Sequence, residues 1–383
     1  MNEMETTDVI IVGGGVIGCA IAYFLRKKHI AVTLLERGEI GGQASGAAAG
    51  LLAPLGPLSG PGPFADLVLA GCSSLSSLAP ELEDISGMRM GYEQTGALRT
   101  VRNPKRLAHL QKRLNNWQSL GLQLYWLSGE EARQREPLLA SDICAAVYAP
   151  EESQIQATSV VQAFARAAQR LGATISPHQE VSQVLTQRQK VIGVTTVQGK
   201  TLGCHRLIIA SGAWAAQCGA WFQVTLPIHP LHGQMISLPQ TVPHLKHIIF
   251  GEAAYLAPRG ETILVGATKE EMGFDSSVTE KGTSWLYATA TRLVPEVIHR
   301  NIQATWAGLR PKTPDGHPLV GFLPHWDNVL VAAGHNSVGI ILSAITGQCV
   351  SEMVATGEVP PLIRPFSVAR FLTNDSFPTL DGT

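Results

Sequence analysis

Charge is scarce in this chain of 383 residues: Asp, Glu, Lys and Arg together make up 15 % of it, and the formal net charge is −1. Proteins that bind nucleic acid or anionic lipid electrostatically carry a strongly basic surface. The near-neutral balance therefore predicts no nucleic-acid partner and favours a small molecule. Hydrophobic residues make up 45 % of the chain, so much of it is expected to be buried, and two domains are the natural arrangement at this length.

Clustered cysteines and long apolar runs are also lacking. The six cysteines form no CxxC pair and no metal-binding spacing: Cys19, Cys72, Cys144, Cys204, Cys218 and Cys349. Isolated cysteines at apolar positions are usually small core residues, which predicts free thiols in a reducing compartment. No uninterrupted apolar run reaches the length of a membrane span, and residues 1–8 are too short, polar and acidic for a signal peptide. We therefore expect a cytoplasmic protein without membrane insertion.

The chain does contain a glycine turn near its start. An apolar strand, residues 9–12, runs directly into the pattern GxGxxG. In a dinucleotide-binding turn, Gly13 allows the tight bend, Gly15 lets the backbone approach a pyrophosphate, and Gly18 lets the next helix pack against the strand. The N-terminus of that helix attracts phosphate, and Glu36, at the end of the second strand, accepts hydrogen bonds from ribose hydroxyls. The sequence thus predicts an adenine dinucleotide site; a glycine turn without a ligand is the plain alternative.

Small residues dominate positions 41–52, and prolines and glycines dominate positions 54–63. Beside a dinucleotide site, the first stretch indicates a backbone that lies close against something flat, although a packed Ala-rich helix is the alternative. The second stretch cannot continue a helix or a strand ladder, so it predicts a loop.

Hydrophobic periodicity and capping signals outline the rest of the chain. Helices are predicted at 104–120, from 129 onward, at 158–171, near 283–293 and at 340–354, and strands at 88–101, 174–176, 181–185, 193–197, 206–214, 230–249, 255–267, 302–309 and 329–332. The buried strand at 206–214 breaks into a small-residue turn, so we expect it to rejoin the first sheet with Gly212 at the cofactor edge.

A strand, a glycine turn and a helix recur at the end of the chain, which predicts an interleaved α/β fold. We expect a Rossmann-like cofactor domain, built from residues 1–85, 151–222 and 307–383. The intervening residues 86–150 and 223–306 would form a second, mostly antiparallel α+β substrate domain.

Further motifs narrow the choice among dinucleotide-binding proteins. Glu36 is followed by arginine, residues 306–311 read WAGLRP, and residues 332–335 read AAGH. With these motifs the chain resembles the D-amino-acid oxidase family of flavoproteins, and within it the glycine oxidase branch associated with thiamine biosynthesis. The resemblance covers residues 8 to about 353, and it implies the two-domain fold of that family.

The resemblance implies FAD as the cofactor. Several members of the family that oxidise methylated amines attach their flavin through a cysteine in the final third of the chain. Here the only cysteine after Cys218 is Cys349, which lies inside the last predicted helix, so non-covalent attachment is expected. The adenosine half of FAD is expected to contact Gly13, Gly15, Val16, Ile17 and Gly18 at the pyrophosphate turn, Glu36 and Arg37 at the ribose, and Val181 at the adenine. Ala44 and Ser45 are expected beside the pyrophosphate and ribityl chain, and Gly212 at the cofactor edge of the sheet. The flavin ring is expected to lie along Ala49, Gly50 and Leu51, with its pyrimidine end enclosed by His335, Asn336, Ser337, Val338, Gly339, Ile340 and Ile341.

The expected chemistry is hydride transfer from the Cα of an amino acid to flavin N5, which requires placement and needs little acid–base help if the amine is already neutral, so no catalytic side chain is predicted. Arg310 is the predicted clamp for the substrate carboxylate, since its planar fork can bind both oxygens; a structural ion pair is the alternative. Tyr255 matches the family's active-site tyrosine, or is an ordinary strand tyrosine. His229 and His232 either face the site or are hydrogen-bonded core groups.

One position departs from the family pattern. Glycine oxidases carry an arginine two residues after the histidine of the final turn, where this chain has Ser337. Serine in place of arginine removes a positive charge and leaves more space near the expected substrate site. We therefore expect Ser337 to line the substrate site, and the substrate to be a larger or N-substituted glycine, or another small amino acid or amine.

The expected activity is oxidative deamination with O2 as acceptor, giving H2O2 and an imine that could feed thiazole assembly. A dehydrogenase of the same family would pass the electrons to a quinone or a partner protein, and the residues favour neither. A module without catalysis and a nicotinamide dehydrogenase fit less well, because residues 306–310 and 44–52 match flavin oxidases. The resemblance also implies a homo-oligomer.

Overall fold

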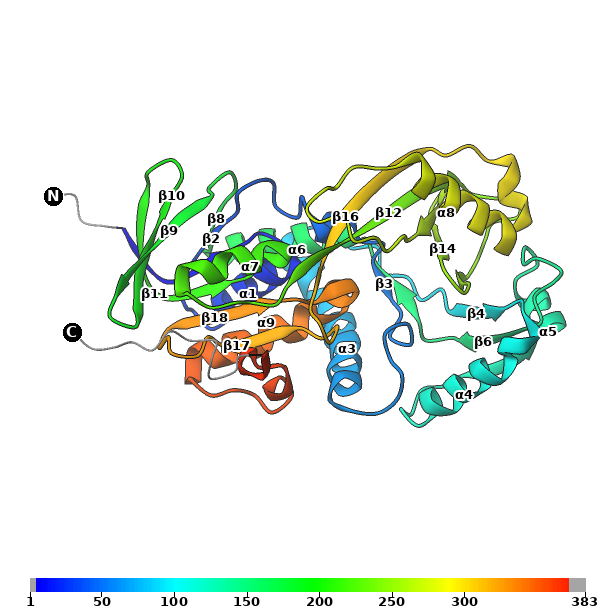
Figure 1. The fold of residues 1–383 in the computed structure, drawn as a ribbon, viewed down its shortest axis with the longest axis horizontal. Helices are drawn as coiled ribbons and strands as arrows, with labels where there is room; N and C mark the ends of the chain where they lie inside the picture. The colour runs from blue at the N-terminus through cyan, green and yellow to red at the C-terminus, as the bar shows by residue number, and fades with distance from the viewer. Residues whose placement is uncertain (1–4, 372–383) are drawn as a thin grey trace.

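The structure is a computed structural model that describes residues 5–371. Two large sheets stand next to each other, and the chain passes between them several times (Figure 1). The first sheet and its helices lie on the left in Figure 1, and the second sheet lies on the right.

The first sheet is mostly parallel. Its strand order is β17-β18-β11-β1-β2-β8, with bounds β1 (Thr6–Val12), β2 (Val32–Leu35), β8 (Thr174–Ser176), β11 (Thr201–Ile209), β17 (Leu319–Phe322) and β18 (Val329–Ala333). The hairpin β9 (Val181–Gln187) and β10 (Lys190–Thr196) extends β11. β1 pairs in parallel with both β2 and β11, and β11 pairs in parallel with β18. The predicted return of the middle strand to the first sheet is confirmed.

Alternation along β1 assigns its two faces to two cores. Val9 and Ile11 pack into the core of α1 (Val16–Lys27), α3 (Pro63–Ser86), α6 (Ala157–Arg170) and α9 (Gly339–Thr356). Ile10 and Val12 pack on the other side, with the hairpin and α7 (Ala215–Cys218). The sequence pattern does not predict α3, whose interior contains Pro80.

The second sheet is mostly antiparallel. Its order is β16-β12-β15-β14-β13-β4-β6-β5, with bounds β4 (Ala97–Val101), β5 (Tyr125–Ser128), β6 (Ala145–Ala149), β12 (His229–Pro239), β13 (Ile248–Phe250), β14 (Tyr255–Arg259), β15 (Thr262–Gly266) and β16 (Ala304–Lys312). The helices of this half are α4 (Leu107–Gln118), α5 (Gly129–Arg135) and α8 (Glu280–Leu293). The capping box predicted before residue 129 is present at the start of α5.

The remaining elements are short. α2 (Ala44–Ala47) precedes β3 (Leu51–Leu52), which pairs with β7 (Ser153–Gln154). The 3-10 helices are η1 (Pro104–Arg106), η2 (Gly212–Trp214), η3 (Gly219–Phe222), η4 (Pro295–His299), η5 (Asn336–Val338), η6 (Arg364–Phe366) and η7 (Val368–Phe371).

Three features expected from the sequence differ in the structure. The Ala-rich helix, the alternative for residues 41–52, is reduced to the four residues of α2. Residues 88–96 form no strand, because Gly91 and Gly96 adopt positive φ and leave only an isolated bridge at Glu93. The expected boundary at residue 306 falls inside β16, which pairs with β12 along its whole length.

The last long helix is apolar and buried. Within residues 5–371, one helical stretch, Asn336–Thr356, is long and apolar enough to cross a membrane, and 72 % of its apolar window is buried inside the protein. It packs against α1 and α3. Its hydrophobicity is therefore explained by its place in the core. All six cysteines are free, as expected.

Candidate active site

A single large cavity of about 1200 Å³ is lined by residues of both sheets. It collects every residue predicted to contact cofactor or substrate, with the exception of Gly18. These residues come from the glycine turn, α2, the end of β11, β14, β16 and η5. Segments far apart in the sequence therefore meet at one site.

The glycine turn has the tight geometry that its spacing predicts. Gly13 has a φ of +116°, and a Cβ there would lie 2.5 Å from the carbonyl oxygen of Ala210. A Cβ on Gly18 would lie 2.0 Å from the carbonyl oxygen of Gly13. Gly18 thus brings α1 against the turn and stays out of the cavity, whereas Gly15 caps the helix and lines it.

Two side chains shape the end of β2. Glu36 accepts hydrogen bonds from the N–H groups of Gly14 at 2.6 Å and Gly38 at 2.9 Å, so it closes the turn as well as lining the cavity. The guanidinium of Arg37 stacks on Trp214, with its Cζ 4.0 Å from the ring centroid. Phe274, from the loop after β15, also contacts Trp214, with ring centroids 5.3 Å apart. Trp214 was not among the predicted site residues.

The small-residue stretch lies against both α1 and β16. Ser45 Oγ accepts a hydrogen bond from Val16 N–H at 3.0 Å, and Trp306 Nε1 donates to the Ala47 carbonyl at 3.0 Å. Arg259, another residue that the sequence did not single out, donates to the Ala49 carbonyl at 2.8 Å. The backbone expected along the isoalloxazine is therefore fixed from the second sheet.

The final turn, η5, forms a further wall of the cavity. His335 is buried, and its Nε2 lies 3.2 Å from Thr346 Oγ1. Burial lowers the pKa of His335 to about 3, so this side chain is neutral at physiological pH. Ser337 and the N-terminus of α9 line the cavity at the same turn, where the positive end of the helix dipole favours negative charge.

Arg310 brings a half-buried positive charge to the cavity. Its Nη1 donates to the carbonyls of Thr268 at 3.1 Å and His232 at 3.4 Å, and no Asp or Glu among residues 5–371 forms a salt bridge with it. Burial lowers its pKa from the ordinary value. Gly233 lies beneath the guanidinium, because a Cβ there would be 2.1 Å from Nη1. The ion-pair alternative for Arg310 is therefore wrong within the described chain.

Tyr255 lies on the neighbouring β14 and lines the same cavity. Its hydroxyl is 3.6 Å from Met235 Sδ. Burial raises the pKa of Tyr255 to about 12, and the nearby Arg310 opposes this shift. The phenol is therefore protonated and can donate a hydrogen bond at neutral pH.

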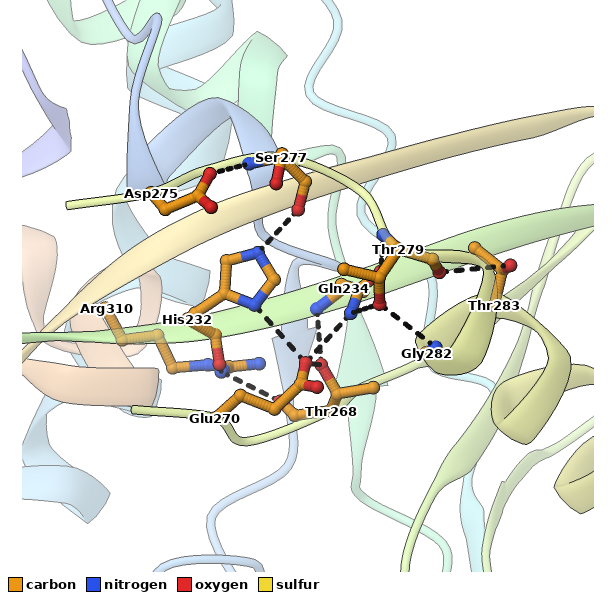
Figure 2. A network of polar contacts seen from close by, with 10 residues as sticks. All are labelled: His232, Gln234, Thr268, Glu270, Asp275, Ser277, Thr279, Gly282, Thr283 and Arg310. Atoms are coloured by element: carbon orange, nitrogen blue, oxygen red, sulfur yellow. Dashed lines mark hydrogen bonds and ion pairs between the residues drawn. The ribbon is translucent and has the colours of Figure 1, made fainter. Parts of the chain in front are cut away.

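The two histidines of β12 do not line the cavity. His232 is fully buried, with Nδ1 3.3 Å from Glu270 Oε2 and Nε2 3.0 Å from the Ser277 carbonyl (Figure 2). His229 is partly exposed and lies 3.8 Å from Glu271. Of the two alternatives, His232 is thus a hydrogen-bonded core group.

Comparison with known proteins agrees with this geometry. Residues 8–353 match the family described as FAD dependent oxidoreductase, or DAO. The chain belongs to this family. Glycine oxidase of Geobacillus kaustophilus is 34 % identical over 95 % of this chain and 97 % of its own.

A solved structure and a longer relative extend the comparison. The crystal structure of glycine oxidase from Geobacillus kaustophilus has a TM-score of 0.92 and 33 % identity, covering 96 % of this chain and 100 % of that chain. The bifunctional protein ThiO/ThiG of Synechocystis is 35 % identical over 98 % of this chain, which spans 56 % of that relative. The expected fold, the cofactor FAD and the oxidoreductase class are therefore confirmed.

Proposed function

We propose that this protein oxidises the Cα–N bond of glycine, or of a small N-substituted glycine or D-amino acid, with O2 as the electron acceptor. Arg310 carries the proposal: a half-buried guanidinium without an acidic partner in the described chain lines the same cavity as the dinucleotide turn. Removing part of the hydration of an unpaired cation is costly. A substrate carboxylate would offset that cost.

The cavity fits FAD by its own geometry. Gly15 opens α1 toward the cavity, and a Cβ there would occupy space 3.2 Å from Ser45 Oγ. In our proposal this turn and Ser45 hold the pyrophosphate, Glu36 and Arg37 hold the adenosine ribose, and residues 49–51 and 335–341 enclose the flavin. FAD supplies the hydride acceptor when bound.

The protein's own groups bind and orient the substrate. The fork of Arg310 binds both carboxylate oxygens, and the protonated hydroxyl of Tyr255 donates to the same carboxylate. Both side chains are half-buried, which reduces screening by water and strengthens their electrostatic interactions. Placement of the Cα–H bond is the main contribution required.

Ser337 is where we expect substrate preference to be set. It lines the cavity beside the final turn and offers a hydroxyl where the family pattern has an arginine. Glycine, sarcosine, iminodiacetate and D-alanine should be compared by anaerobic bleaching of the flavin. We expect sarcosine or iminodiacetate to be preferred; a clear preference for glycine would contradict this.

Admitting air to the reduced enzyme tests the acceptor. Rapid reoxidation with stoichiometric H2O2 is expected for an oxidase. A dehydrogenase would remain reduced until a quinone or an artificial acceptor is added. Absence of bleaching with all four substrates would contradict the proposed function as a whole.

The comparison with ThiO/ThiG leads us to propose that the imine product supplies thiazole synthesis in thiamine biosynthesis. We also propose a cytoplasmic homo-oligomer. Deleting the gene and testing growth with and without thiamine checks the first proposal. Sedimentation of the purified holoenzyme checks the second.

A further inference from the structure

The direction of the Arg310 guanidinium is fixed by hydrogen bonds to two backbone carbonyls, and no acidic side chain within residues 5–371 pairs with it. Its two acceptors lie on different segments: His232 on β12 and Thr268 on the loop after β15. The direction of the guanidinium therefore depends on how these segments are held together. Any movement of one relative to the other would redirect the fork.

Glu270 joins these two segments through one oxygen. Its Oε2 accepts hydrogen bonds from Thr268 Oγ1 at 2.7 Å and Gln234 Nε2 at 2.8 Å, and lies 3.3 Å from His232 Nδ1 (Figure 2). The backbones of His232 and Glu270 also exchange hydrogen bonds at 3.0 Å in both directions. Two of the three side chains on this oxygen belong to the residues whose carbonyls hold Arg310.

The network continues to the far end of the same loop. His232 Nε2 lies 3.0 Å from the Ser277 carbonyl, and Gln234 Oε1 accepts from Thr279 N–H at 2.7 Å. Thr279 in turn caps α8 through Gly282 N–H. The loop is thus fixed at both ends against β12.

Hydrogen bonds from Thr268 and then Gln234 keep the pKa of Glu270 below its ordinary value. Glu270 is therefore an anion at neutral pH, and hydrogen bonds to charged groups are among the stronger ones. It does not line the cavity, so it cannot touch a substrate there. Its influence would pass through the two carbonyls.

We propose that Glu270 is a positioning residue for substrate binding: it holds the carbonyls of His232 and Thr268 so that the fork of Arg310 faces the incoming carboxylate. This inference rests on the proposed function, because it assigns Glu270 to the carboxylate site of that reaction. It extends the substrate-binding machinery beyond the residues that line the cavity.

The test compares Glu270→Ala and Glu270→Gln with Glu271→Gln in the FAD-loaded protein. Glu271 is the adjacent carboxylate, which is exposed and paired with Lys312. Acetate is the probe, and calorimetry gives its Kd independently of turnover. Glu270→Ala should raise the acetate Kd and the glycine KM about tenfold, as expected for the loss of a partly buried, charged hydrogen-bond acceptor, with kcat changed less than about twofold. Glu270→Gln should show a smaller rise, because the amide oxygen still accepts from Thr268, and Glu271→Gln should show none.

A double-mutant cycle shows whether the effect passes through Arg310. In an Arg310→Lys background, adding Glu270→Ala should change the acetate Kd less than about twofold. Fully additive effects, or unchanged acetate Kd and KM in Glu270→Ala, would overturn the proposal while leaving the proposed oxidation intact. A wild-type protein that oxidises none of the amines, but whose acetate binding depends on Glu270, would overturn the proposed function and support the positioning role.

Discussion

At the scale of single residues, Arg310 is notable because no acidic side chain among residues 5–371 pairs with it. Changing Arg310 to lysine keeps the positive charge but removes the planar fork. We expect kcat/KM to fall roughly 100-fold, or about 2.8 kcal/mol, mainly through KM. Steady-state kinetics with the preferred amine measure this. Lys312→Gln, two residues along the same strand and paired only at the surface, should change kcat/KM little, and an equal loss in both variants would argue against the clamp.

His335 makes a prediction about acid stability. Its pKa is about 3 in the folded protein, against an ordinary value of 6.5, so between these values the unfolded chain binds a proton that the folded chain does not. Stability from this group is therefore lost as pH falls through that window, by up to ~1.4 kcal/mol per pH unit. Urea unfolding at pH 7 and pH 5 should show a smaller acid loss in His335→Asn than in wild type. The exposed His244→Asn variant is the control and should behave like wild type.

Some site residues are visible in the sequence because their requirement is local. Gly13 and Glu36 belong to one short unit, residues 9–36, whose spacing predicts that they lie together at a dinucleotide turn. Trp214 and Arg259 escape prediction because each acts on a segment distant in sequence: Trp214 stacks with Arg37, and Arg259 binds the Ala49 carbonyl. The residues next to Trp214 and Arg259 in the sequence give no indication of these two contacts.

At the scale of elements, Gly15 and Gly18 lie near the junction of β1 and α1 but have different roles. Gly15→Ala is compatible with the extended backbone there, but its methyl group would enter the cavity. We expect the apoprotein to lose less than about 1 kcal/mol, since Ser45 Oγ, 3.2 Å from the added methyl group, is the one atom that must shift slightly, while the Kd for FAD rises at least about tenfold. Gly18→Ala would place a methyl group against the Gly13 carbonyl and should cost about 1–3 kcal/mol of stability. Urea unfolding and FAD fluorescence titration measure the two effects; equal behaviour of the variants would contradict the assigned roles.

Element prediction succeeded where periodicity was strong and failed where tertiary packing decided. The strands of the first sheet and the final helix follow from continuous apolar runs. α3 was not predicted because Pro80 and a serine-rich stretch interrupt the apolar periodicity of its buried face. The segment 88–96 has the composition of a strand, yet its glycines turn the backbone away from a ladder.

At the scale of the whole molecule, the cavity makes covalent attachment of the flavin unfavourable. Cys218 is the only cysteine that lines it, and burial raises the pKa of that thiol, which disfavours the reactive thiolate. Unfolding in urea followed by filtration should therefore release all of the flavin into the filtrate. Cys218→Ala should bind and release FAD as wild type does. Flavin that stays with the unfolded wild-type chain would show a covalent bond.

The interleaved order of the first sheet has a consequence for biosynthesis. β18 lies beside β11, and α9 packs on α1, so strands made first wait for partners made last. At about 5–20 residues per second, the interval between the end of β11 at Ile209 and the start of β18 at Val329 is roughly 6–24 s. During that time the nascent sheet exposes an unpaired edge, a surface that chaperones protect. Because η5 and the start of α9 line the cavity, the cofactor site is complete only in chains that have been synthesised as far as this final turn.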